Sequence, residues 1–197
     1  MSSESTPSTL TDAWVRNSTY VLDSVLAANR ATLAAFGVET DEEVDTDEEI
    51  IAGEERPEWT VELTEERRDA LAVGDRVEFS KRLTDDDVRA FAAASGDTNP
   101  LHLDEEYAEE TMFGERIAHG TLVSGLISAA LARLPGLVIY LSQDEEFHNP
   151  VGIGDRATAE CEIVEDLGKN RYRLRTTVKN GDETAIDGEA VVMLDEP

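Results

Sequence analysis

The sequence predicts an α+β domain in which an antiparallel sheet wraps round one long central helix. The segment from Ile117 to Leu134 is the most apolar helical candidate in the chain, and a helix that is apolar nearly all round has no face to turn to water. The chain after Pro135 reads almost entirely as strands separated by turns. A sheet folded round that helix is the arrangement that buries both.

The composition indicates a globular protein with an extreme surplus of acid. The 197 residues include 44 Asp and Glu against 17 Lys and Arg, a formal net charge of -27. Such a charge argues against nucleic acid or an anionic membrane surface as a partner. Because like charges repel each other unless salt screens them, we expect a halophilic host with a saline cytoplasm.

Other features also indicate a cytoplasmic protein. The single cysteine, Cys161, excludes an internal disulfide, is consistent with a reducing compartment and is expected to be a buried core residue. The first ten residues are polar, without the basic and apolar regions of a secretory signal. The longest apolar stretch, Ala118 to Leu141, is interrupted by Arg133 and Pro135, so we expect no membrane span.

The region before the predicted domain divides into two parts. Between Thr11 and Phe36 apolar residues recur at spacings of three and four, which predicts an amphipathic helix. From Glu39 to Glu58 acidic residues dominate, and such a segment cannot bury enough apolar surface to offset its ordering entropy. We therefore divide the chain into an N-terminal amphipathic helix (1–38), an acidic linker (39–70) and the sheet-and-helix domain (71–197).

The domain is expected to open with a strand and two helical segments. The strand runs from Arg76 to Leu83. Thr84 then supplies a helix N-cap, with the acid Asp87 three residues later. The helix extends from Asp85 to about Ala94, and another helical turn is expected from Asp104 to Glu110.

Four strands are expected after the central helix. Asn180-Gly181 is the strongest hairpin signal among the turns that separate them. The strands are predicted at Leu137 to Phe147, Ala157 to Val164, Arg171 to Val178 and Thr184 to Leu194.

The stretch S-G-D-T-N-P-L-H, residues 95–102, contains the first candidates for chemistry. Asp97 and His102 lie five residues apart across an Asn-Pro step, and proline disfavours helical geometry for the residue before it. A bend of this kind can aim both side chains at one water molecule, which would make a general acid-base pair. The same residue types are common in ordinary surface loops, so the stretch alone does not establish a catalytic role for Asp97 and His102.

A second candidate element is His119-Gly120, at the start of the central helix. The first amides of a helix are unpaired and lie at the positive end of its dipole, so an amide near Gly120 could hold a developing oxyanion. Alternatively, Gly120 is small only for packing. The three histidines, His102, His119 and His148, include no pair at the spacing of a helical metal site, so we expect no metal.

These elements resemble the MaoC-type hydratases, and most closely the R-specific enoyl-CoA hydratases of polyhydroxyalkanoate synthesis. The resemblance is carried by S-G-D-T-N-P-L-H-L-D at 95–104, by I-A-H-G at 117–120, and by the segments 139–141 and 147–155. It runs from about Val73 to Leu194. It implies a hot-dog fold, meaning an antiparallel sheet wrapped round a long helix, and usually a homodimer joined edge to edge.

The resemblance also implies an activity without a cofactor. The enzyme would add water across the 2,3 double bond of a trans-2-enoyl-CoA to give the (R)-3-hydroxyacyl-CoA, linking fatty-acid β-oxidation to polyhydroxyalkanoate monomers. Asp97 and His102 would hold and activate the water, with His102 preferred as the base and Asp97 as the proton relay, although the reverse stays open. The residues expected to bind the thioester or its acyl chain are Gly120, Ser128, Asn99 and Leu131.

Two alternatives stay open. The substrate could be a branched or dicarboxylic enoyl-CoA or an acyl-carrier-protein thioester, although a carrier protein is itself acidic and this chain should repel it. The protein could instead be a non-catalytic, thioester-binding protein of polyester granules. Its N-terminal helix loosely resembles those of phasins and could dock on the granule surface. The acidic run Gln143–Glu146 departs from the family pattern and is expected to face solvent.

Overall fold

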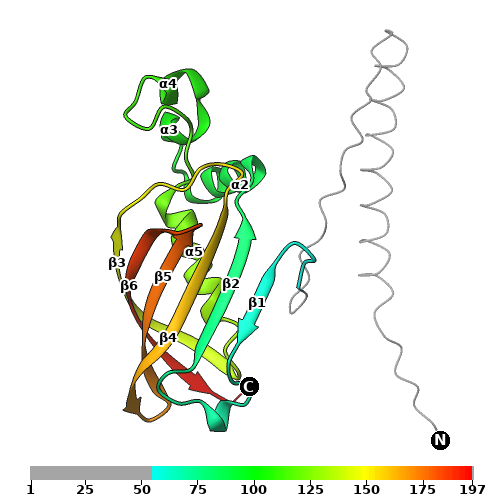
Figure 1. Cartoon of the computed structure of the whole chain (residues 1–197), viewed down its shortest axis with the longest axis vertical. Helices are drawn as coiled ribbons and strands as arrows, with labels where there is room; N and C mark the ends of the chain where they lie inside the picture. Colours follow the sequence, from blue (N-terminus) through cyan, green and yellow to red (C-terminus); the bar gives the residue numbers. More distant parts are fainter. Residues whose placement is uncertain (1–54, 197) are drawn as a thin grey trace, which may run out of the picture. The chain divides into compact units, whose positions relative to one another are not determined.

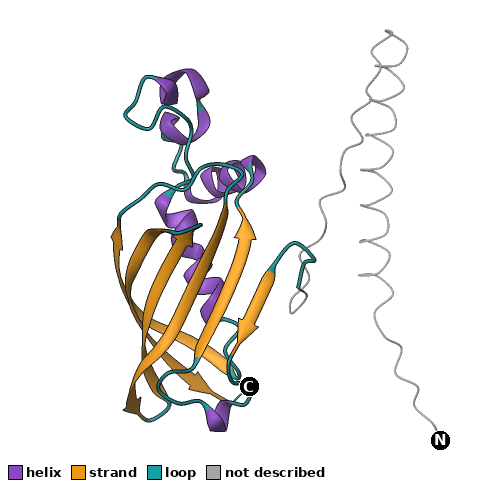
Figure 2. Cartoon of the chain, viewed as in Figure 1, coloured by secondary structure: helices purple, strands orange, loops and turns teal. Residues whose placement is uncertain are grey.

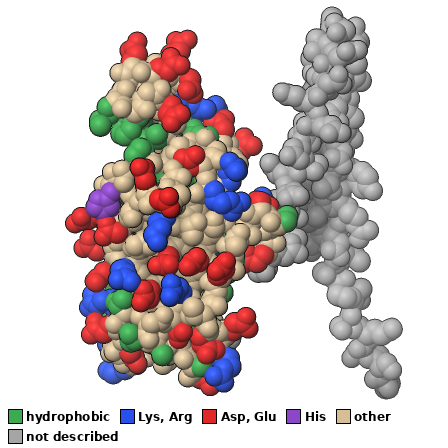
Figure 3. Space-filling view, viewed as in Figure 1, with side chains coloured by type: hydrophobic (Ala, Val, Ile, Leu, Met, Phe, Trp, Pro, Cys, Tyr) green, Lys and Arg blue, Asp and Glu red, His purple; other side chains and the backbone are tan. Residues whose placement is uncertain are grey.

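The computed structural model describes residues 55–196. The predicted amphipathic helix (1–38) and the linker before residue 55 lie outside the described residues. Asp and Glu side chains are spread over the visible face of the described residues, with Lys and Arg among them (Figure 3). Within residues 55–196 no helix is long and apolar enough to cross a membrane.

Six antiparallel strands form one sheet in the order β1-β2-β4-β5-β6-β3 (Figure 1). The strands are β1 (Thr60–Leu63), β2 (Arg76–Arg82), β3 (Leu137–Phe147), β4 (Arg156–Gly168), β5 (Arg171–Asn180) and β6 (Glu183–Asp195). A short 3-10 helix, η1 (Arg68–Ala70), connects the first two strands. Helix α5 (Gly120–Leu131) lies in the curve of the sheet, behind β2 and β4 in this view (Figure 2). This hot-dog arrangement confirms the predicted fold.

The core lies between α5 and the concave face of the sheet. Val123, Ile127 and Ala130 on the helix are buried against strand residues that include Cys161 and Leu174. Burial raises the pKa of the Cys161 thiol to about 12. The expectation that Cys161 is a core residue is therefore confirmed.

One face of α5 is open, so the expectation that this helix is buried nearly all round is wrong there. Thr121, Gly125 and Ser128 are exposed along that face. The helix also begins at Gly120, later than the predicted Ile117. The reason is that the Ala118 amide bonds the Val151 carbonyl at 2.9 Å, which holds the preceding residues in an extended bridge.

The sheet begins before residue 71. Strand β1 pairs with β2, with Val61 opposite Phe79, inside the range that the sequence analysis gave to the linker. Trp59, Val61 and Leu63 pack on the core at alternate positions. The residues between them, Thr60 and Glu62, are exposed.

Three short helices connect β2 to α5 and project from one end of the sheet (Figure 1). They are α2 (Asp85–Ser95), α3 (Pro100–Leu103) and α4 (Glu105–Glu109). The predicted cap of α2 is confirmed, because Thr84 Oγ1 accepts from the Asp87 amide at 3.2 Å and the Asp87 carboxylate accepts from the Thr84 amide at 2.9 Å. Gly96 ends α2 with a φ of 79°, in the left-handed region that glycine adopts readily.

Candidate active site

The Asn99-Pro100 step makes the bend that positions His102. Asn99 is extended, with a ψ of 125°, and Pro100 is the first residue of α3. The Asn99 Oδ1 accepts from the Leu101 amide at 3.1 Å and so caps this short helix. Asn99 therefore has a structural role here, and its contact with substrate stays a prediction.

One ring nitrogen of His102 is hydrogen-bonded to the backbone and the other, Nε2, is not. Its Nδ1–H donates to the Ile117 carbonyl oxygen at 2.8 Å, and a carbonyl can only accept. In the neutral ring the proton therefore sits on Nδ1, and Nε2 keeps its lone pair. The side chain is only 8% exposed, so this nitrogen is held in a fixed and mostly dry position.

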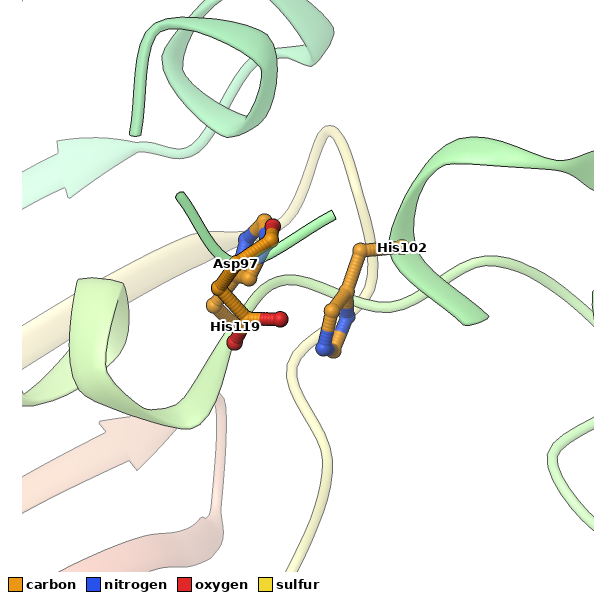
Figure 4. Close-up of side chains that lie close together, drawn as sticks. All are labelled: Asp97, His102 and His119. Carbon is orange, nitrogen blue, oxygen red and sulfur yellow. The ribbon is translucent and has the colours of Figure 1, made fainter. Parts of the chain in front are cut away.

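The Asp97 carboxylate points toward the His102 ring (Figure 4). Its Oδ1 accepts from the Asn99 amide at 3.3 Å, which fixes the side chain over its own loop. The ligand atoms of Asp97, His102 and His119 all lie within 4.8 Å of one another. One water molecule can bridge two polar groups at such a separation.

His119 is a third member of this cluster that the sequence analysis left out of the site. Its Nε2–H donates to the Asp97 backbone carbonyl at 3.0 Å, and the ring is 1% exposed. The ring lies 3.9 Å from that of His102, centroid to centroid, and 4.9 Å from that of Phe91. Its Nδ1 is buried and has no hydrogen-bond partner in the described part of the chain. The only sequence signal for this role is its position directly before Gly120.

Gly120 and His102 line the same cavity, of about 330 Å³, which we call the inner chamber. As the first residue of α5, Gly120 has an amide with no carbonyl partner within the helix, at the positive end of the helix dipole. A side chain at this position would meet the Phe147 ring, whose Cε1 lies 2.9 Å from the site of a Cβ. The glycine therefore serves packing as well as exposing its amide.

Ser128 and Leu131 lie away from the inner chamber. Ser128 lines a second hollow of about 530 Å³ between α5 and β3, which we call the outer groove. Burial, together with the nearby Glu145 carboxylate, raises the pKa of Tyr140 in this groove to about 12. Leu131 is buried in the core and lines neither of these two cavities.

Comparison with known proteins gives the family. Residues 69–187 match the family model described as the MaoC like domain. The 3-hydroxybutyryl-CoA dehydratase of Methylorubrum extorquens is 46% identical over 125 residues, which cover 62% of this chain and 80% of that protein. The (R)-specific enoyl-CoA hydratase of Aeromonas caviae is 44% identical over 129 residues, covering 64% and 96% of the two chains.

A solved structure agrees with these matches. The (R)-hydratase from A. caviae involved in PHA biosynthesis aligns with a TM-score of 0.62 and 41% identity, covering 64% of this chain and 98% of that one. This chain belongs to the MaoC-like family. Like the relatives named above, this MaoC-like protein is a hydro-lyase.

Arg116 holds together the segment from Thr84 to His119, which we call the active-site segment of the MaoC-like domain. Its guanidinium donates to Asp85 at 2.7 Å and to Glu105 at 2.9 Å, and reaches the His102 carbonyl at 3.4 Å. Hydrogen bonds from Arg89 and Arg116 hold the pKa of Asp85 below its usual value. One cation therefore ties the beginnings of α2 and α4 to the helix that carries His102.

Two clusters in residues 55–196 have the composition of metal ligands. One is Asp97, His102 and His119, and the other is Glu146, His148 and Asp187 on the surface. In the first cluster each ring already uses one nitrogen to donate to a backbone carbonyl. The remaining groups of this MaoC-like site are those that an acid-base pair needs, and the absence of a metal stays a prediction.

Proposed function

We propose that this enzyme hydrates trans-2-enoyl-CoA to (R)-3-hydroxyacyl-CoA without a cofactor. The observation that carries the proposal is that His102 and Gly120, the first residue of α5, line one cavity, while the Asp97 carboxylate lies within 4.8 Å of the ring nitrogens of His102 and His119. The relatives named as a 3-hydroxybutyryl-CoA dehydratase and an (R)-specific enoyl-CoA hydratase support the substrate class.

The proposed reaction assigns a role to each of these groups. Asp97 and His102 hold a water molecule, and His102 Nε2 takes its proton as the oxygen attacks C3 of the enoyl group. The electron pair of the double bond moves toward the thioester oxygen, where the Gly120 amide stabilises the enolate charge. The proton that His102 took passes to the Asp97 carboxylate and from there to C2, so both residues return to their starting states and the water adds without a net change of charge. If Asp97 is the base and His102 the relay, the protons balance in the same way.

The product suggests a place for the enzyme in metabolism. The enoyl thioesters that it would consume arise from fatty-acid oxidation, and (R)-3-hydroxyacyl-CoA would supply monomers for polyhydroxyalkanoate. The similarity to the A. caviae (R)-hydratase, which is involved in PHA biosynthesis, supports this assignment. We further propose a cytoplasmic enzyme in a halophilic host, in keeping with the net charge of -27.

Hydration of crotonyl-CoA in high salt, followed by the loss of thioester-conjugated absorbance, tests the proposal. Asp97→Ala and His102→Ala should each lower kcat roughly a hundred- to ten-thousand-fold in protein that remains folded. Glu106→Gln, which removes an exposed carboxylate from α4, is the matched control and should keep wild-type activity. More than about a tenth of the activity in either alanine variant would contradict the assigned roles.

We also propose that the enzyme is a homodimer joined through β3. This strand lies at the edge of the sheet, and its unpaired backbone groups are accompanied by exposed apolar side chains. These side chains are Leu137, Tyr140, Leu141 and Phe147. Light scattering should give a mass twice the 21.6 kDa of one chain, and a monomer at micromolar concentration would refute the dimer.

Two assays separate this proposal from its alternatives. Parallel measurement with crotonyl-CoA and the corresponding acyl-carrier-protein thioester should favour CoA, because the acidic carrier is repelled. A granule-associated, non-catalytic protein would instead bind polyester granules and hydrate neither substrate.

A further inference from the structure

Phe147 separates the inner chamber from the outer groove. It is the one residue that lines both of these cavities. Its ring packs on Gly120, where the Cε1 and Cδ1 atoms lie 2.9 and 3.2 Å from the site of a Cβ. The ring is nevertheless 56% exposed, because within one chain it is packed only on the side that faces α5.

The two cavities differ in chemistry. The inner chamber is lined mostly by apolar residues, among them Ile117, Val123 and Ile186, with His102 on its wall. The outer groove is lined by the hydroxyls of α5 and by polar side chains of β3. These polar residues are Thr121, Ser124, Ser128, Tyr140, Gln143 and Glu145.

The polar groups of the outer groove are paired with one another. Ser124 Oγ donates to the Glu145 carboxylate at 2.5 Å, across the space between α5 and β3. Gln143 donates to Thr176 Oγ1 at 3.1 Å and accepts from the Tyr140 hydroxyl. An apolar chain entering this groove would displace water from these groups without replacing the hydrogen bonds that water makes to them, which is unfavourable.

The Phe147 ring and the Glu145 carboxylate lie on the same side of β3. Side chains at alternate positions of a strand share a face, so Phe147, Glu145 and Gln143 are on one face of β3. The Ser124 contact shows that this face is turned toward α5, so the expectation that the acidic run faces solvent is wrong for Gln143 and Glu145. An acyl chain that starts at the Gly120 amide and grows along α5 would meet the Phe147 ring first and the Glu145–Ser124 pair next.

We propose that Phe147 is the specificity-determining residue that ends the acyl chamber, and that it restricts the enzyme to short-chain enoyl thioesters. The Glu145–Ser124 pair reinforces the limit, because a chain that passes the ring reaches a carboxylate in place of an apolar surface. This inference rests on the proposed hydratase function and deepens it by naming the substrate class.

The test is the ratio of kcat/KM for trans-2-octenoyl-CoA to that for crotonyl-CoA. The wild-type ratio should lie well below one. Phe147→Ala should raise it at least tenfold, mainly through a lower KM for the longer substrate, since each additional buried methylene then contributes to binding. Adding Glu145→Gln, which keeps the size and removes the charge, should raise the ratio further.

Two further variants keep the test informative. Val73→Ala truncates an exposed apolar side chain that lies before β2, lines neither cavity and is not on the proposed dimer edge, and it should leave the ratio unchanged. Phe147→Leu preserves an apolar contact with Gly120 and should give an intermediate ratio, so a failure of the alanine variant to fold would not end the test. Gel filtration and melting temperature are recorded for every variant.

The outcomes are distinct. A wild type that hydrates octenoyl-CoA as efficiently as crotonyl-CoA would overturn the inference and leave the proposed function intact. An equal fall in kcat/KM for both chain lengths in Phe147→Ala and Phe147→Leu would also overturn it, since the ring would then only support Gly120. A wild type that hydrates no enoyl-CoA would instead refute the proposed function.

Discussion

The sheet with α5 and the segment from Thr84 to His119 are held together by different forces. The first is stabilised by burial of apolar side chains, such as Ile127, Ile163 and Leu174, which are nearly inaccessible to water. The second consists of short helices that contribute Val88 to the same core but are otherwise held by caps and by the ion pairs of Arg116. Stability therefore depends mainly on the sheet and α5, whereas Asp97, His102 and His119 depend on polar contacts for their positions.

The largest effect on stability is expected in the core. Leu174→Ala removes a fully buried side chain from β5 and should lower the free energy of unfolding by about 3 kcal/mol. Denaturant titration gives this value, while kcat of the folded fraction should stay near wild type. Met112→Ala removes a 92% exposed side chain of the active-site segment and should cost less than about 0.5 kcal/mol. Equal losses in the two variants would contradict the division between core and active-site segment.

An intermediate effect, on rate and not on stability, is expected at His119. His119→Leu removes the donor to the Asp97 carbonyl and should lower kcat roughly ten- to a hundredfold, with KM nearly unchanged, because the Asp97 loop loses its support. His119→Gln keeps a terminal N–H near the position of Nε2 and should recover part of the loss. If both variants lose kcat equally, the hydrogen bond from His119 is not what holds the Asp97 loop in position.

The smallest effect is expected at the start of α2 and depends on pH. Burial acts to raise the pKa of Asp87, but hydrogen bonds from Lys81 and Thr84 lower it on balance below 3.8. The folded state therefore binds this proton more weakly than the unfolded state, and the contribution to stability is present above pH 3.8 and lost as pH falls through the folded pKa.

Asp87→Asn should accordingly cost about 1 kcal/mol near neutral pH and progressively less below pH 4. Asp86→Asn removes an exposed acid from the same helical turn and is the matched control for the helix dipole. Chemical denaturation at neutral and acid pH measures both. A cost for Asp87→Asn that persists unchanged at low pH would contradict the assignment.

Local sequence signals predicted the parts of the structure that local physics determines. Thr84 and Asp87 form the predicted capping box, and the hairpin at Asn180-Gly181 turns where expected, with a φ of 59° at the glycine. The proline step at residue 100 also makes the predicted bend before His102. In each case the residue types restrict the backbone without help from distant parts of the chain.

Contacts between distant segments could not be predicted in the same way. His119 meets Asp97 only because the loop after α2 folds over the start of α5. Phe147 meets Gly120, and Ser124 meets Glu145, only because β3 lies beside that helix. The sequence of α5 contains no information about which strand lies beside the helix.

The buried thiol of Cys161 can be used to detect unfolding of the sheet. The thiol lies on β4, flanked by Val77 of β2 and Thr176 of β5. Because burial raises its pKa to about 12, we expect the thiol to stay protonated at neutral pH and to resist disulfide reagents while the sheet is intact. The chain has no other cysteine, so the rate of thiol labelling in the unmodified enzyme would measure how often the centre of the sheet opens.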